Sequence, residues 1–390
     1  MKDFEYLDKN AVYLDAACQS LRPQPVIDAL NRYYKEHNSC GERVKYDWGV
    51  ITDEKVEATR AKILKYVKKN PRHYFASFTL NTTYGLNLIL SQLNVKEAGI
   101  KTIVTSDIEH NSPFLSTISC AKKNHLPRKV ITRNDDGSIN LADIPEKSLV
   151  VVNCASNIDG RLLTNIKDVV KKVHKTGGYI IIDAAQAMAH SSEILYGVEP
   201  DAICFSAHKM YGPSLGGIIM HRKFAELIDT TFIGGGMVDD VDKETYLLSK
   251  DNKEHAYTQF EAGLQAWGEI IGLGAAIDWL ESLSKKDHQE LEEITKKLFE
   301  LLSSKKNLHL VNKVPATTMS FYVDKKELGY DSHVLGAALA DNGIMARTGY
   351  FCVHYYLDHV KHYPPLIRFS LGYHNRPKDI EKVAEALKNL

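Results

Sequence analysis

The stretch Tyr179-Ile-Ile-Ile-Asp-Ala-Ala-Gln-Ala187 decides the fold. Its apolar residues occupy successive positions up to Asp183 and do not alternate with polar ones. This pattern is typical of a strand that is buried on both faces of a mostly parallel sheet. Four other short runs resemble it, at residues 101–106, 148–153, 202–206 and 217–221. A helix is expected between two of the runs, at 165–176, closed by Gly177-Gly178. The middle of the chain is therefore predicted to be an α/β layer structure.

The pattern changes after about residue 283. A charged amphipathic helix is expected at 285–304, strands at 317–323 and 366–371, and a closing helix at 377–390. The N-terminal run 11–15 is expected to pack near these elements. With 390 residues the chain is long enough for two lobes. The sequence thus predicts a large domain at 22–282 and a small α+β domain made of 1–21 with 283–390.

Composition narrows the classes of function. Lys plus Arg and Asp plus Glu number 49 each, so the formal net charge is zero and no global field attracts nucleic acid or an anionic membrane. No run approaches the ~18 apolar residues of a membrane helix, and the acidic start carries no signal-peptide core. Six cysteines without a C-x-x-C pair indicate neither a disulfide scaffold nor a compact zinc site. We expect a cytoplasmic protein with no membrane or nucleic-acid partner.

Polar residues follow the predicted strands. In open α/β sheets, ligands bind beyond the carboxyl ends of the strands. Glu109 and His110 follow the run at 101–106, and Ser156 and Asn157 follow the run at 148–153. The remaining polar residues of this kind are Asp183 and Gln186, then Ser206, His208 and Lys209, and separately Asn81, Thr82 and Thr83 at the start of a predicted helix. One edge of the sheet is therefore expected to collect a functional site.

Each of these residues has two interpretations. Asp183, partly desolvated at a strand end, either pairs with a buried cation or caps the next helix. Lys209 is either a desolvated nucleophile and base or an ordinary surface lysine. The hydroxyls and imidazole of Thr82, Thr83, Ser206 and His208 either hold a phosphate or cap helix ends. Together they provide an acid, a lysine and a cradle for phosphate.

These motifs resemble the class V, fold-type I enzymes that depend on pyridoxal 5′-phosphate (PLP). The resemblance is carried by 179–187 and by Phe205-Ser-Ala-His-Lys-Met-Tyr-Gly-Pro213. It extends over Tyr13-Leu-Asp-Ala-Ala, Asn81-Thr-Thr-Tyr-Gly-Leu-Asn, Ile108-Glu-His-Asn, Gly234-Gly-Gly-Met, Phe260-Glu-Ala-Gly, Arg347-Thr-Gly-Tyr-Phe-Cys and Ile367-Arg-Phe-Ser. Within the class, the chain is most similar to the Suf-type cysteine desulfurases and selenocysteine lyases.

The resemblance implies a role for each residue. Lys209 would carry PLP as a Schiff base, Asp183 would pair with the pyridine nitrogen, Gln186 would face the ring hydroxyl and His110 would stack on the ring. Thr82, Thr83, Ser206 and His208 would hold the phosphate. Asn157, Arg347 and Arg368 would bind the substrate, the last as a fork on its carboxylate. Cys352 would take sulfur from L-cysteine as a persulfide, leaving L-alanine. The family also implies a homodimer and a sulfur-acceptor protein, as in iron–sulfur cluster biogenesis.

Three segments depart from the family pattern. Tyr46-Asp47-Trp48 stands where a histidine is frequent, Leu264-Gln265 replaces a hydroxyl donor to the partner's phosphate, and Tyr350-Phe351 precedes the cysteine. They leave open another class V reaction: a selenocysteine lyase, a C–S β-lyase or an epimerase, with Cys352 only structural. A non-catalytic scaffold is a further alternative. A metal site from Cys352, His354, His359 and His362 fits no zinc spacing, so no metal is expected.

Overall fold

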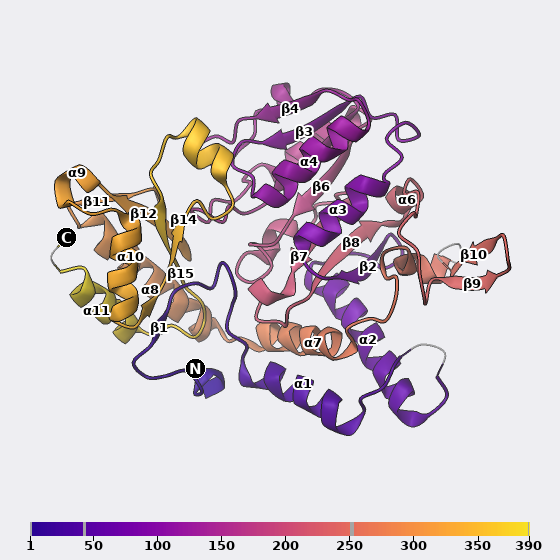
Figure 1. Ribbon diagram of the computed structural model, residues 1–390, viewed down its shortest axis with the longest axis horizontal. Coiled ribbons are helices and arrows are strands. Elements are labelled where there is room, and N and C mark those ends of the chain that lie inside the picture. The colour runs from indigo at the N-terminus through magenta and orange to yellow at the C-terminus, as the bar shows by residue number, and fades with distance from the viewer. Residues whose placement is uncertain (1, 42–43, 250–252, 389) are drawn as a thin grey trace.

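The computed structural model describes residues 2–41, 44–249, 253–388 and 390. It consists of two lobes, each built around a main sheet of its own (Figure 1). The larger sheet has seven strands in the order β2-β8-β7-β6-β5-β3-β4. β3, β4, β5, β6 and β7 run parallel, and β8 is antiparallel to both of its neighbours. Their bounds are Tyr74–Thr79 (β2), Thr102–Ser106 (β3), Arg128–Ile131 (β4), Ser148–Asn153 (β5), Tyr179–Asp183 (β6), Ala202–Ser206 (β7) and Gly216–His221 (β8). The α/β class predicted for the middle of the chain is confirmed.

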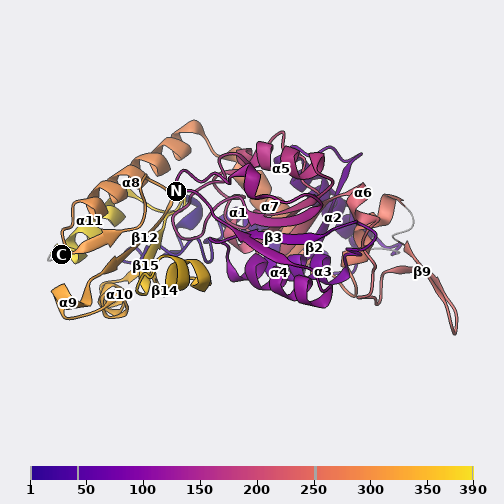
Figure 2. The ribbon, with the colours of Figure 1, turned by 90° about the horizontal axis from the view of Figure 1, so that it is seen from above.

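Helices cover both faces of this sheet, which is why its strands are apolar on successive positions. Figure 2 shows α3 and α4 on one face and α5 and α7 on the other. Val150, Val151 and Val152 of β5 are completely buried as a result. The helices of this lobe are Gln24–Glu36 (α1), Asp47–Tyr66 (α2), Thr82–Gln92 (α3), Asn111–Lys123 (α4), Ile166–Lys175 (α5), Arg222–Ala225 (α6) and Trp267–Ser282 (α7). The predicted helix at 165–176 is α5, and Gly177 follows it with a φ of 70°, which glycine adopts without strain.

The smaller lobe contains an antiparallel sheet in the order β11-β12-β15-β14. Its elements are Lys285–Ser303 (α8), Leu308–Leu310 (β11), Thr318–Val323 (β12), Lys325–Leu328 (α9), Ser332–Asp341 (α10), Ile344–Met345 (β13), Arg347–Gly349 (β14), Leu366–Ser370 (β15) and Pro377–Ala386 (α11). A π-helical turn at Tyr355–Val360 lies between β14 and β15. The predicted closing helix ends at Ala386, four residues earlier than expected.

The N-terminal segment joins the smaller lobe. β1 (Val12–Tyr13) pairs in parallel with β13, and Asp15 forms a bridge to Ser370. The division of the chain into 22–282 and 1–21 with 283–390 stays a prediction. In the described part of the chain, no helix has both the length and the apolar character needed to cross a membrane.

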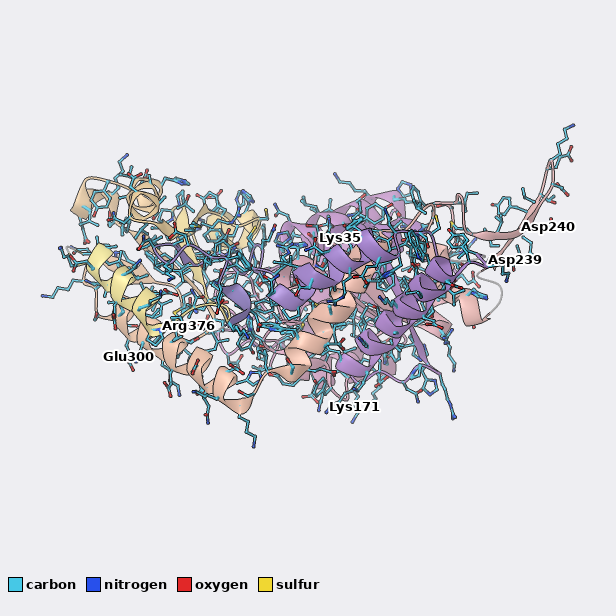
Figure 3. The ribbon with its side chains drawn as sticks, turned by 90° about the horizontal axis from the view of Figure 1, so that it is seen from below. Lys35, Lys171, Asp239, Asp240, Glu300 and Arg376 are labelled. Carbon is cyan, nitrogen blue, oxygen red and sulfur yellow. The ribbon has the colours of Figure 1, made fainter. Side chains whose placement is uncertain are left out.

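A hairpin of β9 (Val238–Val241) and β10 (Tyr246–Leu248) extends away from the larger lobe. Figure 3 shows Asp239 and Asp240 on it, well outside the body of the molecule, whereas Lys35, Lys171, Glu300 and Arg376 mark the surface of that body. Val241 and Leu247 of the hairpin are more than half exposed. This chain therefore leaves apolar side chains uncovered here.

A buried ion pair attaches α2 to the larger sheet and to the segment after the hairpin. Both terminal nitrogens of Arg60 donate to the carboxylate of Glu261 at 2.6 Å, and one of them also donates to Ala76 O of β2. The backbone N–H of Phe78 donates to the same carboxylate. Both ionised side chains are nearly inaccessible to solvent, so each depends on the other to offset its desolvation.

We predict that Arg60→Met destabilises the protein by about 3–5 kcal/mol, because it leaves the Glu261 carboxylate buried without its cation. The double variant Arg60→Met with Glu261→Leu should recover most of the loss. Lys62→Met is the matched control on the same helix: its pair with Asp278 is solvent-exposed and should contribute less than about 1 kcal/mol. Thermal unfolding midpoints of the four proteins check this. Equal midpoints for Arg60→Met and Lys62→Met would contradict it.

Candidate active site

The carboxyl ends of the parallel strands open into a cavity of about 290 Å³. All twelve site residues predicted from the sequence line it: Thr82, Thr83, His110, Asn157, Asp183, Gln186, Ser206, His208, Lys209, Arg347, Cys352 and Arg368. The first nine come from the larger lobe, and the last three from the smaller lobe. The site therefore lies between the lobes. The structure places these residues together, while the role of each stays a prediction.

Lys209 and Asp183 form the electrostatic centre of the cavity. Asp183 ends β6, is 4% exposed, and accepts a hydrogen bond from Ala185 N at 2.9 Å. Burial raises the pKa of its carboxyl group, and the bond from Ala185 and the charge of Lys209 oppose this. Lys209 follows β7. Burial lowers the pKa of its ammonium, Asp183 raises it and Arg368 lowers it further. The net lowering leaves more of the Lys209 amine neutral, and therefore able to accept a proton, than in an ordinary lysine.

His110 caps the N-terminus of α4 and faces the same cavity. Its Nδ1 accepts from the backbone N–H of Ser112 at 3.1 Å, so the neutral ring carries its proton on Nε2. Burial, with the charges of Lys209 and Arg368, lowers the pKa of His110 to about 3. The ring is therefore a neutral, flat surface near the lysine, suited to stacking on an aromatic ligand.

Hydroxyl groups gather at the N-terminus of α3. Thr82 Oγ1 and Ser206 Oγ are 2.7 Å apart, and Thr82 N donates to the same Ser206 oxygen at 3.0 Å. Thr83 Oγ1 lies 2.6 Å from Ser112 Oγ. Burial lowers the pKa of the neighbouring His208 to about 4, with a contribution from Lys209, so His208 is a neutral donor. A helix N-terminus surrounded by neutral donors favours an anion such as a phosphate.

Two arginines of the smaller lobe share one carboxylate. Arg368 is 2% exposed, and its terminal nitrogens donate to Asn157 O at 3.1 Å and to Asp15 Oδ1 at 3.2 Å. Arg347 donates to Asp15 Oδ2 at 2.8 Å. Arg368 Nε is a buried donor that the described part of the chain leaves unpaired.

Cys352 lies on a tight turn over the cavity. Phe351 and Cys352 have φ values of 48° and 59°, the left-handed region that few non-glycine residues adopt. Bonds from the larger lobe hold this turn: Asn157 Nδ2 donates to Phe351 O at 2.8 Å, and Asn111 N donates to Cys352 O at 2.6 Å. Cys352 is solvent-exposed, whereas Phe351 is 8% exposed and lies under Arg368. The turn places Cys352 where the cavity is open to solvent and keeps the aromatic ring buried.

Two predicted residues already have partners within the protein. Gln186 Nε2 donates to Ala17 O at 2.7 Å, so this amide holds the N-terminal segment against the site. The Asn157 amide group supports the cysteine turn, as described above. Either side chain would serve a ligand through its amide oxygen.

Sequence reasoning missed three cavity-lining residues with polar or thiol groups, and it gave no role to a fourth, Asn81, which it placed at the helix start. Ser112 follows His110 by two positions, and Asn153 is the last residue of β5. The rule of strand ends and helix starts would have included both. Cys18 is the third. It lies between β1 and α1, and no local pattern marks it.

The segments that depart from the family pattern lie mainly outside this cavity. Leu264 is 77% exposed, and Tyr46 and Trp48 are about half exposed. Phe351 alone among the departing residues lines the cavity. Within the described ranges, no three His, Cys, Asp or Glu side chains gather as metal ligands.

We predict that His110 stays neutral between about pH 5 and pH 8, because its pKa lies well below that range. The resonances of His110 in ¹⁵N-histidine spectra are assigned as those that disappear in His110→Gln. Their chemical shifts should not change over this pH range and should correspond to the Nε2–H tautomer. His174 is the internal control: its hydrogen bond to Asp201 raises its pKa, so it should titrate. A midpoint for His110 near its ordinary value would contradict the prediction.

Comparison with known proteins places this chain in a family. A probable cysteine desulfurase of Pyrococcus abyssi is 28% identical, over 98% of this chain and 95% of the relative. The apo structure of a cysteine desulfurase from Thermococcus onnurineus superposes with a TM-score of 0.86 at 26% identity, over 97% of this chain and 95% of that one. A cystine C–S lyase in complex with cysteine persulfide shares the fold alone, at 17% identity, a TM-score of 0.78 and 98% coverage of both chains. Residues 12–383 match the family model described as aminotransferase class-V, and the chain belongs to that family.

Proposed function

We propose that this protein is a PLP-dependent cysteine desulfurase. It converts L-cysteine to L-alanine and holds the sulfur as a persulfide on Cys352, for transfer to an acceptor protein in iron–sulfur cluster or other sulfur biosynthesis. The observation that carries the proposal is one cavity shared by Lys209, Asp183 and Cys352. The relatives named cysteine desulfurases support it, since they match the chain over nearly its whole length.

The donor set of the cavity fits PLP. The buried Asp183 carboxylate suits a protonated pyridine nitrogen, which would offset the cost of its desolvation. The neutral ring of His110 suits stacking on the cofactor ring. The N-terminus of α3, with Thr82, Thr83, Ser206 and His208, suits the phosphate. Lys209 lies near Asp183 and supplies the amine that links the cofactor.

When bound, PLP supplies an electron sink that makes the Cα–H bond of the attached amino acid acidic. Lys209 is the base that takes this proton, because burial and Arg368 lower the pKa of its ammonium. Arg368, held in place by Asp15 and by the backbone carbonyl of Asn157, provides the guanidinium for the substrate carboxylate. Asp15 fixes the orientation of Arg368 and Arg347, so that the carboxylate meets a fork already in place.

Cys352 is the nucleophile toward sulfur. Its thiolate forms an S–S bond with the substrate sulfur while the substrate C–S bond breaks, and the carbon keeps the electron pair and later takes up a proton. The products are alanine and a persulfide on Cys352, without an external oxidant. The exposed position of Cys352 supports onward transfer to an acceptor protein.

A cytoplasmic homodimer is the setting that we propose. Leu80, Phe232 and Leu264 are 64%, 52% and 77% exposed, and Leu80 directly precedes the helix start that faces the cavity. Burying such side chains against a second copy would stabilise a dimer. Six unpaired cysteines suit a reducing compartment.

We predict that Lys209→Ala abolishes the yellow Schiff-base absorbance and the adduct trapped by borohydride, and lowers the rate of alanine formation by at least about 10²-fold, because the proton-transferring base is lost. Absorbance spectra and peptide mass spectrometry check this. A wild-type protein that binds no PLP would favour the scaffold alternative.

We predict that Cys352→Ala loses both alanine formation from L-cysteine and the persulfide, since the sulfur then has no acceptor. Cys40→Ala is the matched control, because Cys40 is also exposed but does not line the cavity. Alanine assays and mass spectrometry after alkylation report the result. Sulfide or alanine release that persists in Cys352→Ala would instead support a class V lyase that needs no persulfide.

A further inference from the structure

The cavity contains a second thiol, Cys18, that the proposed reaction does not use. Cys18 lies between β1 and α1, is partly buried and lines the same cavity as Cys352. Its backbone N–H donates to Asp15 O at 3.0 Å, which closes a tight turn. The other four cysteines do not line this cavity, and three of them, Cys120, Cys154 and Cys204, are buried.

Hydrogen bonds attach the turn of Cys18 to the site on both sides. Gln186 donates to the carbonyl of Ala17, and Ser20 N donates to the carbonyl of His208 at 2.9 Å, next to Lys209. The side-chain hydroxyl of Ser20 donates to the same carbonyl at 3.0 Å. Cys18 is therefore held at the residues that flank the lysine.

An ion pair links the two cysteine segments. Asp15, three residues before Cys18, accepts from Arg347, five residues before Cys352, at 2.8 Å. Arg368 joins the same carboxylate at 3.2 Å. Although the two cysteines are separated by 334 positions in sequence, the pair of Asp15 with Arg347 joins their segments, and both cysteines line the same cavity.

Positive charge surrounds the space that both thiols face. Cys18 lies within electrostatic range of Lys209, Arg347 and Arg368, and Cys352 lies within range of Lys209. Arg368 Nε, buried and without a partner among the described groups, adds an unused donor. These cationic groups therefore lie beside the cavity that Cys18 and Cys352 both line.

We propose that Cys18 is a second sulfur acceptor, which receives the sulfane sulfur from Cys352 within the same protomer. This rests on the desulfurase function proposed above. The Cys18 thiolate attacks the terminal sulfur of the Cys352 persulfide, and the bond between that sulfur and Cys352 Sγ breaks. Cys352 leaves as a thiolate and takes up the proton that Cys18 released when its thiol ionised. Before the transfer Cys352 carries the persulfide and Cys18 is a thiol, and afterwards the two are reversed. No oxidant or reductant is therefore required.

The transfer makes Cys352 available for a second turnover before any acceptor protein binds. We therefore expect a pre-steady-state burst of two alanines per protomer in the wild type and one in Cys18→Ser. After reaction with L-cysteine, alkylation and proteolysis, mass spectrometry should find persulfide on both cysteines of the wild type. Cys352→Ala should carry it on neither, whereas Cys18→Ser should carry it on Cys352 alone.

Cys40 separates a directed transfer from chemical scrambling, because it is exposed and outside the cavity. Persulfide on Cys40 equal to that on Cys18, or persulfide on Cys18 in Cys352→Ala, would overturn the proposal. So would a wild-type burst of one alanine with persulfide on Cys352 only, a result that leaves the desulfurase function intact. A wild type that forms neither alanine nor persulfide would instead overturn that function, and the relay with it.

Discussion

The common direction of β3, β5, β6 and β7 is the constraint on which the rest of the site depends. Parallel strands end at one edge of a sheet, so the residues that follow them must meet there. Asp183 and Lys209 become neighbours because β6 and β7 are adjacent and parallel. Helices on both faces exclude water from the sheet, so the Asp183 carboxylate and the Lys209 ammonium are both desolvated. Burial raises the pKa of Asp183 and lowers the pKa of Lys209, and both shifts favour the neutral form of the group. The chemistry of the site is therefore a consequence of the layer architecture.

A second constraint holds the two lobes together. Asp15, from the N-terminal segment, accepts from Arg347 and Arg368 of the smaller lobe, and Arg368 donates to the larger lobe through Asn157 O. One carboxylate compensates two guanidiniums, of which one is buried. This arrangement leaves a net positive region that favours an anionic substrate group. It also sets the position of the two turns that carry Cys18 and Cys352.

The turn at Phe351 and Cys352 has an unfavourable backbone conformation that hydrogen bonds from the larger lobe stabilise. Two consecutive residues in the left-handed region cost free energy, and the surrounding structure must supply it. Asn157 and Asn111 of the larger lobe bond the turn from one side, and the ring of Phe351 packs under Arg368. Asn157 thus contributes to the site by orienting the cysteine, in addition to any contact with a substrate.

The sequence by itself determined five of the seven strands of the larger sheet, β3, β5, β6, β7 and β8, because burial on both faces produces an apolar run and strand ends are local. It did not indicate β2 or β4. Its motifs also indicated the family and twelve of the residues that line the cavity. Only the tertiary structure decided that Cys18 joins them, that Asp15 links Arg347 to Arg368, and that Gln186 and Asn157 bond to the backbone. These contacts connect residues up to 353 positions apart, and no local pattern encodes them. Their geometry arises only when both lobes are packed around the N-terminal segment.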